Sequence, residues 1–234
     1  RYHFTFQPGA LQIAPNGTEP ERYAHLSIPP QARQQLGLME ALTVGFSGHF
    51  YEGRGIALLL EIARALPEIQ FLWMGGEEKH IQPWREELKK WQIANVTLTG
   101  FIPNEKLPLF QAACDMLLMP YEKKIAGSSG GDISKVINPM KMFDYLACGR
   151  AIIASDIPVF HEILSEQTAL FCPSDDSQAW VAAIQKLARQ EEERERLAQN
   201  AKALSQQYSW KKRAEKTLSL LDRLEDIMHE KKMA

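Results

Sequence analysis

Short apolar runs alternate with amphipathic stretches along most of the chain. The apolar runs are continuous, and they lie at 42–46, 71–74, 96–98, 116–119, 151–154 and 170–172. Between them, apolar residues recur every three or four positions, which predicts helices near 58–66, 82–91, 107–113, 140–147, 180–187 and 191–207. Strands without polar alternation are typical of a parallel sheet that is covered on both faces. We therefore predict an α/β fold, a doubly wound parallel sheet with helices on both faces.

The two ends of the chain fit this pattern less well. Residues 1–17 show no clear period and end in the turn Pro15-Asn16-Gly17, so we interpret them as a linker that leads into an α/β domain at 18–209. Residues 210–234 are predicted to form a last helix, whose apolar stripe consists of Leu220, Leu221, Leu224, Ile227 and Met228. This stripe needs a surface to lie against, and we expect it to stay partly exposed in this chain.

The charge balance narrows the class of partner. The chain has 27 lysine and arginine residues against 29 aspartate and glutamate residues, and its formal net charge of −2 gives no reason to expect a nucleic-acid partner. Any anion site must therefore be local. Acidic neighbours dilute the basic residues of the last helix, so we expect these to be solvated, with a peripheral membrane contact of the full-length protein as the alternative.

The cysteines and the lack of long apolar segments bear on the cellular compartment. Cys114, Cys148 and Cys172 lie in apolar segments without the spacing of metal ligands, so we interpret them as reduced core residues. Reduced cysteines suit a cytoplasmic protein. No apolar run reaches about 18 residues, and no basic leader precedes one, so the sequence predicts neither a transmembrane helix nor a signal peptide.

The first candidate site follows the strand at 42–46. In open α/β sheets, ligands bind beyond the carboxyl ends of the strands. In the segment 47–55, glycines leave the backbone accessible, and Arg54 carries a fixed positive charge just before a helix. Gly48, His49 and Arg54 together suit a diphosphate. The alternative is that the glycines only form a tight turn and that His49 is a solvated loop residue.

The second candidate site is the start of the helix at 140–147. Asn138, Pro139 and Met140 mark its first turn, where backbone amides and the helix dipole attract phosphate. Lys141 and Asp144 are three residues apart, so we expect them on one face, with Lys141 near phosphate and Asp144 accepting from ribose hydroxyls. The alternative is a surface ion pair between the two, which contributes only about 0.3–0.5 kcal/mol.

Short motifs stand in a fixed order along nearly the whole chain. They are Ala14-Pro15-Asn16-Gly17, Gly45-Phe46-Ser47-Gly48, Arg54-Gly55, Gly100-Phe101-Ile102-Pro103, Ala113-Cys114-Asp115, Met119-Pro120, the most specific stretch at 138–150, Ser155-Asp156 with Glu162, and Tyr208-Ser209-Trp210. Each motif is weak alone, but their order and spacing resemble the C-terminal, nucleotide-sugar-binding domain of glycosyltransferase family 4. The resemblance implies one half of a GT-B fold, which has two Rossmann-like domains, with the N-terminal acceptor-binding half absent here.

The resemblance implies roles for several of the candidate residues. Arg54 stands where the family usually has a phosphate-binding lysine, and His49 stands where it often has arginine. Asp144 stands at the second acidic residue of the family's paired-glutamate motif, which usually binds the ribose. The first glutamate of that motif falls on Val136, so its usual contact with the donor sugar is left without a residue.

The same resemblance places Gly75 and Ile102 in the base region. It implies transfer of a sugar from a UDP- or GDP-linked donor with retention of configuration and without a metal or other cofactor. The catalytic residues are unknown and are expected in the missing N-terminal domain, so this chain is expected to be inactive alone. Two alternatives stay open. One is a nucleotide-sugar epimerase of the same fold, and the other is an inactive nucleotide-binding or interaction module, which Val136 and His49 favour.

Overall fold

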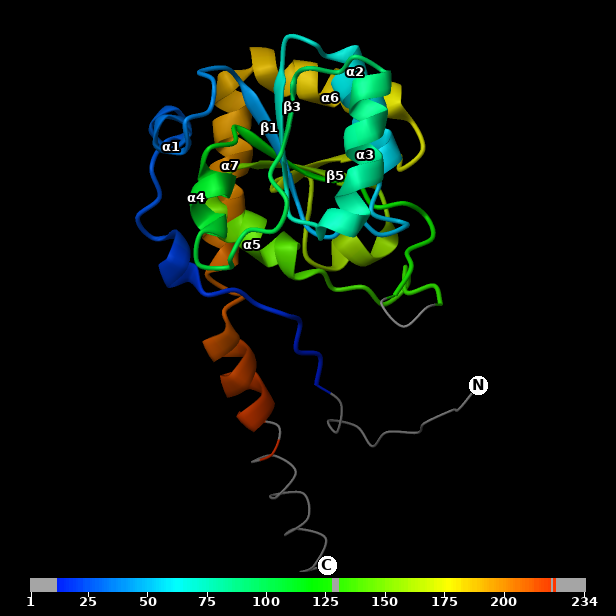
Figure 1. The fold of residues 1–234 in the computed structure, drawn as a ribbon. Coiled ribbons are helices and arrows are strands. Elements are labelled where there is room, and N and C mark those ends of the chain that lie inside the picture. The colour runs from blue at the N-terminus through cyan, green and yellow to red at the C-terminus, as the bar shows by residue number, and fades with distance from the viewer. Residues whose placement is uncertain (1–11, 128–130, 220, 222–234) are drawn as a thin grey trace, which may run out of the picture.

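A six-stranded parallel sheet forms the centre of the fold (Figure 1). A computed structural model describes residues 12–127, 131–219 and 221 of the 234-residue chain. The strand order is β3-β2-β1-β4-β5-β6, and each pair of neighbours is parallel. The strands are β1 (Thr43–Ser47), β2 (Gln70–Met74), β3 (Val96–Leu98), β4 (Met116–Met119), β5 (Ala151–Ser155) and β6 (Ala169–Cys172). This order confirms the predicted doubly wound arrangement, in which β1 and β4 flank the point where the order reverses.

Helices cover both faces of the sheet, as the apolar runs predict. One face carries α1 (Pro29–Leu36), α4 (Leu107–Ala112) and α5 (Met140–Cys148), whereas the other carries α2 (Ile56–Ala65), α3 (Glu78–Lys90) and α6 (Ser177–Arg189). The last helix of the domain, α7 (Glu191–Ser205), packs against α5, α6 and β5. Every residue of β1, β4 and β5 is buried because helices lie above and below these strands.

The cysteines and the bounds of two helices agree with the sequence analysis. Cys114, Cys148 and Cys172 are buried and unpaired, which confirms them as core residues. The predicted helices at 140–147 and 191–207 correspond to α5 and α7 within two residues at either end. Among the described residues, no helix is long and apolar enough to cross a membrane.

The sequence analysis missed three short helices. They are α1, the 3-10 helix η1 (Pro20–Tyr23) and the 3-10 helix η2 (Pro158–Glu162), and each has proline at its first or second position. Helix α1 ends at Gly37, which adopts the left-handed conformation with φ 64°. Only Ala32 and Arg33 of α1 are buried, so its apolar periodicity is too weak to predict a helix.

The segment that leads into the domain pairs with the residues that follow α7. The Thr18 N–H donates to the Tyr208 carbonyl at 2.9 Å, and the Trp210 N–H donates to the Thr18 carbonyl at 3.1 Å. Residues 210–219 then form a helix that leads away from the sheet (Figure 1). Of the predicted apolar stripe, Leu221 is 53% exposed. The other four stripe residues, Leu220, Leu224, Ile227 and Met228, lie outside the described residues.

Candidate functional site

The end of β1 is fastened to helix α5, which brings the two candidate segments together. The Tyr145 hydroxyl accepts a hydrogen bond from the Ser47 N–H at 2.7 Å and lies 3.1 Å from the Ser47 hydroxyl. All three groups are buried, and burial raises the pKa of Tyr145, so its phenol stays neutral. On the other side of β1, the Gly48 N–H donates to the Met74 carbonyl of β2 at 2.9 Å. The backbone at Gly48 is therefore held against both α5 and β2.

Removing the Tyr145 hydroxyl should loosen this junction. We expect Tyr145→Phe to lower the free energy of unfolding by about 1–3 kcal/mol, because the buried Ser47 N–H loses its acceptor. Urea unfolding measures the change. The matched control is Tyr208→Phe: the Tyr208 ring packs on Phe143, with centroids 5.4 Å apart, and no hydrogen bond of its hydroxyl is found among the described residues. Equal losses in both variants would contradict this account of the junction.

Lys141 carries the most unusual side chain of the site. Its Nζ is buried and has no hydrogen-bond partner within the described part of the chain. The atom lies 4.0 Å from the centroid of the Phe46 ring and 5.1 Å from that of the Tyr121 ring. Burial holds the pKa of Lys141 well below its usual range, and the nearby Arg54 lowers it further. Burial of an amine without a hydrogen-bond acceptor costs free energy, and an anion bound beside Lys141 would provide the acceptor.

Arg54 lies over the Tyr121 ring, as Lys141 does, but it comes from the segment that follows β1. Its Cζ lies 5.0 Å from the Tyr121 centroid, so Arg54 and Lys141 share one ring. Burial raises the pKa of Tyr121 to about 12, which keeps the phenol neutral. Gly55 follows with φ 72° as the N-cap of α2, and its N–H donates to Glu122 Oε1 at 3.3 Å. Neither cation forms an ion pair with a carboxylate anywhere in residues 12–127, 131–219 and 221.

His49 lies beside these cations and is held by stacking. Its ring is parallel to the Tyr51 ring, with centroids 4.8 Å apart and an interplanar angle of 3°, and His80 meets Tyr51 edge-on at 5.1 Å. Burial lowers the pKa of His49, and the charges of Arg54 and Lys141 lower it further. The imidazole is therefore neutral near neutral pH, and it is able to donate one hydrogen bond to an anion.

Asp144 lies on the same helix as Lys141 but contacts a different segment. Its carboxylate accepts a hydrogen bond from the Thr18 hydroxyl at 2.7 Å, and burial raises its pKa. No ion pair between Lys141 and Asp144 occurs among the described residues, so the alternative of a surface ion pair is wrong. The reason is that Lys141 extends toward β1 whereas Asp144 extends toward the leading segment of the chain.

The start of α5 is also held by the leading segment. Asn138 accepts hydrogen bonds from Asn16, through its side-chain oxygen from the Asn16 N–H at 2.8 Å and through its carbonyl from the Asn16 amide at 2.7 Å. Pro139 caps the helix in an extended conformation, and Met140 at the first helical position is exposed. Asn138, Pro139 and Met140 therefore form the helix start, as predicted, and two hydrogen bonds fix its direction.

Of Gly75 and Ile102, the two residues predicted near the base, only Gly75 adjoins the segment that carries the cations. The Gly75 N–H donates to the Gly100 carbonyl at 2.9 Å, and a Cβ at Gly75 would lie 2.6 Å from the Gly48 carbonyl oxygen. The ends of β1, β2 and β3 are therefore adjacent. Ile102 is half-buried and packs on the core, whereas its neighbour Phe101 is largely exposed. No contact that the structure records joins Ile102 to the cations.

The site thus has a centre and a periphery. The structure brings Gly48, Arg54 and Lys141 together, with His49 close enough for its pKa to respond to both cations. The sequence analysis gave no role to Phe46 and Tyr121, the two rings beside the cations. Phe46 was noted only as part of a motif, and Tyr121 directly follows Met119-Pro120 at the exit of β4. In the described part of the chain, no three His, Cys, Asp or Glu side chains are grouped as metal ligands.

Comparison with known proteins identifies the family. Residues 41–190, more than half of the chain, match the family described as Glycosyl transferases group 1. The chain belongs to this family. Among curated proteins, this group 1 glycosyl transferase is similar to the putative teichuronic acid biosynthesis glycosyltransferase TuaH of Bacillus subtilis (strain 168). The two are 23% identical over 175 residues, which cover 75% of this chain and 42% of TuaH.

Two solved structures of the GT-B class have the same fold. Sucrose-phosphate synthase (tll1590) from Thermosynechococcus elongatus matches with a TM-score of 0.76 and 22% identity, covering 92% of this chain and 53% of that protein. Alr3699/HepE from Anabaena, solved in complex with UDP-glucose, matches with a TM-score of 0.69 and 17% identity, covering 90% and 56% respectively. This group 1 glycosyl transferase therefore spans about half the length of the proteins it resembles.

Proposed function

We propose that this chain is the C-terminal, donor-binding half of a retaining glycosyltransferase of family 4, which transfers a sugar from a UDP- or GDP-linked donor. The observation that carries the proposal is the pair of cations on Tyr121. Arg54 and Lys141 meet there from two strand exits, and Lys141 Nζ is buried without a partner. A diphosphate between them provides the missing negative charge. Membership of the group 1 family and the likeness to a UDP-glucose complex support this reading.

The arrangement of charge supports a mechanism that needs no metal ion. When the bond between sugar and diphosphate breaks, negative charge builds up on the leaving diphosphate. In the proposed complex, Lys141, Arg54 and the N-terminal amides of α5 stabilise this charge, with His49 donating one further hydrogen bond. These groups are fixed before the donor binds, because aromatic rings and backbone hydrogen bonds hold them in place.

The nucleoside is proposed to extend from this centre along two directions. Asp144 accepts from the ribose hydroxyls, for which it exchanges or shares its present bond to Thr18. Gly75 and Ile102 border the base, where the ends of β2 and β3 leave the backbone accessible. Val136 is exposed at the position of the first family glutamate, so the contacts to the donor sugar differ from those of a glutamate-bearing site.

The remainder of the active site is proposed to lie in a second, N-terminal half. The chain spans 53% and 56% of the two solved structures, which leaves room in a protein of that length for an acceptor-binding domain. Residues 1–17 would link the two halves, residues 18–209 would form the donor-binding domain, and the segment 210–234, which begins with the helix at 210–219, would return toward the N-terminal half. The acceptor site and the catalytic residues would then lie there, and the isolated chain would be inactive.

Calorimetric titration with UDP tests the proposal. We expect binding with a Kd on the order of 0.1–1 mM and net proton uptake, because the diphosphate raises the pKa values of Lys141 and His49 from their lowered positions. Binding enthalpies measured in buffers of different ionisation enthalpy give the number of protons. Chelation of divalent ions should leave the affinity unchanged. A parallel titration with GDP decides between the two bases, and absence of binding for both nucleotides would refute the proposal.

A further inference from the structure

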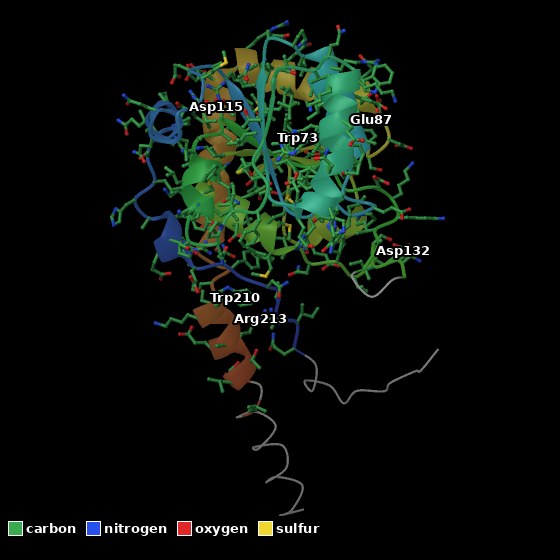
Figure 2. All side chains as sticks on the ribbon, viewed as in Figure 1. Trp73, Glu87, Asp115, Asp132, Trp210 and Arg213 are labelled. Carbon is green, nitrogen blue, oxygen red and sulfur yellow. The ribbon has the colours of Figure 1, made fainter. Side chains whose placement is uncertain are left out.

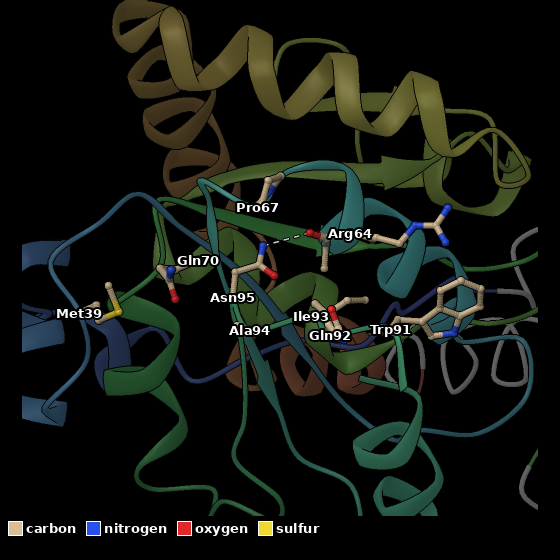
Figure 3. Close-up of a pocket in the computed structure, with 10 residues that line it drawn as sticks. Met39, Arg64, Pro67, Gln70, Trp91, Gln92, Ile93, Ala94 and Asn95 are labelled. Atoms are coloured by element: carbon tan, nitrogen blue, oxygen red, sulfur yellow. Dashed lines mark hydrogen bonds between the residues drawn. The ribbon is translucent and has the colours of Figure 1, made fainter. Parts of the chain in front are cut away.

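A hollow lies at the edge of the sheet opposite the two cations, and Figure 3 shows the residues that line it. It has a volume of about 560 Å³ and lies between the end of α2, the end of α3 and the residues that precede β2 and β3. Arg64, Gln70, Trp91 and Gln92 contribute side chains to it. Because the strands are parallel, residues that precede them lie at the edge away from Gly48 and Lys141.

Trp91 presents a fixed aromatic surface at one end of this hollow. The residue caps the C-terminus of α3 and is 47% exposed. Its indole N–H donates to Glu87 Oε2 at 2.7 Å, and the Arg64 guanidinium lies 4.9 Å from the ring centroid. The Lys90 ammonium lies 5.6 Å from the same centroid. Three partners thus hold the ring, while about half of the residue remains in contact with water. A large aromatic surface that is both fixed and open is typical of a contact site.

Gln92 is held in a conformation that its residue type disfavours. Its φ is 52°, and it is the one non-glycine residue with positive φ in the described part of the chain. Its N–H donates to the Lys89 carbonyl at 3.1 Å, and the Ile93 N–H donates to the Leu88 carbonyl at 2.9 Å. This pair of hydrogen bonds is the Schellman ending of a helix, in which glycine is preferred at the position of Gln92. A glutamine side chain therefore stands where the backbone favours glycine, next to Trp91 in the chain.

The polar groups of the hollow are mostly uncharged. The Asn95 amide donates to three carbonyls, those of Ala63, Leu66 and Ile69, at 2.8–3.0 Å. These bonds join the residue that precedes β3 to the end of α2 and to the residues before β2. Gln70 and Gln92 each offer an amide that donates and accepts. Arg64 is the one charged side chain among the residues that line the hollow.

This chemistry matches a sugar ring better than a phosphate or a peptide. One face of a pyranose is rich in C–H groups and stacks on an indole, while its hydroxyls both donate and accept, as carboxamides do. A polyanion requires several cations, whereas the lining of this hollow supplies only Arg64. Lys90, which also lies over the Trp91 ring, is already paired with Glu87 at 3.0 Å. We propose that the hollow between α2 and α3 is a saccharide-binding site separate from the donor site, in which a neutral glycan chain stacks on Trp91 and is hydrogen-bonded by Gln92 and Gln70.

The direct test is an NMR titration of the whole 234-residue chain with maltotetraose and with chitotetraose. We expect the Trp91 indole signal to shift and to saturate, with a Kd on the order of 1 mM. Trp91→Ala should weaken binding at least tenfold. The matched control is Trp210→Ala, since Trp210 also has an arginine beside its ring, Arg213 at 5.4 Å, but lies on the helix at 210–219 far from Glu87 (Figure 2). This control should bind saccharide like the unchanged protein.

A second variant keeps the test decisive if Trp91→Ala does not fold. Gln92→Gly should raise the melting temperature by about 2–4 °C, because it removes the strained φ, and it should weaken saccharide binding about tenfold. Saturating UDP and the variant Lys141→Met should leave saccharide affinity unchanged, so failure at the donor site cannot be mistaken for failure here. The proposal is overturned if neither saccharide shifts the Trp91 signal at about ten times 1 mM. Undiminished binding by Trp91→Ala, or binding of uridine in place of the saccharides, also overturns it.

Discussion

Replacing Lys141 with methionine should abolish nucleotide binding and stabilise the protein at the same time. Methionine fills similar space between Phe46 and Tyr121 but carries no amine, so the affinity for UDP should fall about 100-fold or more. The free energy of unfolding should rise by about 1–3 kcal/mol, because a buried amine without a hydrogen-bond partner is removed. Calorimetric titration and urea unfolding of the same sample measure the two effects.

The pH dependence of stability gives a separate signature of Lys141. In the folded protein its pKa lies well below the usual range, whereas in the unfolded chain it returns to about 10.4. The unfolded chain thus binds this proton more tightly, so the stability contribution rises with pH between these two pKa values and is lost below them. In Lys141→Met, the free energy of unfolding, measured by urea unfolding at several pH values across this range, should depend less on pH than in the unchanged protein.

Lys135→Met is the matched control for the charge. Lys135 is exposed, lies six residues before Lys141 and belongs to the loop that leads into α5. Its removal changes the net charge of the protein equally, and it should alter UDP affinity less than about threefold and stability by less than about 0.5 kcal/mol. If Lys141→Met retains UDP affinity, or if it destabilises the fold, Lys141 is an ordinary core residue and the diphosphate site lies elsewhere.

Gly55→Ala should have the largest effect on stability of any single methyl group added to the site. Gly55 has φ 72°, and a Cβ there would lie 1.6 Å from the carbonyl oxygen of Pro120. The two nearest atoms belong to the backbone of Pro120 and cannot rotate away, so relief requires the start of α2 to move away from the end of β4. We expect a loss of about 4 kcal/mol or more in the free energy of unfolding, together with loss of UDP binding, because Arg54 moves with the loop.

Gly37→Ala separates backbone strain from steric overlap. Gly37 has φ 64°, close to that of Gly55, but no heavy atom lies within 4 Å of the position that its Cβ would take. Only the cost of a left-handed alanine remains, about 1–2 kcal/mol, and UDP binding should be unaffected. Similar losses in the two variants, measured by urea unfolding, would show that the contact between Gly55 and Pro120 is unimportant.

The candidate site was predictable where its residues follow strand ends directly. Gly48 and Arg54 come after β1, and Lys141 lies on the first turn of α5, so their positions along the chain mark them. Tyr121 was not predictable, because an aromatic residue after a strand is equally consistent with the core. Its role emerges only when two cations from segments 87 residues apart, Arg54 and Lys141, are seen on the same ring.

The relation of Lys141 to Asp144 shows where local periodicity stops being informative. A spacing of three residues correctly places both on neighbouring positions of one helix. It does not determine their partners, because these come from distant segments: Phe46 of β1 for Lys141, and Thr18 of the leading segment for Asp144. The predicted roles in binding phosphate and ribose remain predictions until the nucleotide titrations are done.

What the amino-acid sequence determined by itself is the architecture. Uninterrupted apolar runs of three to five residues between amphipathic stretches are typical of strands buried on both faces, and such strands form the parallel sheet with helices on both sides. Only the tertiary structure decided which partners the charged side chains of the site have. Whether the Lys141 amine is buried without a partner depends on which distant side chains surround it, here Phe46 and Tyr121, and those neighbours meet only after the chain has folded.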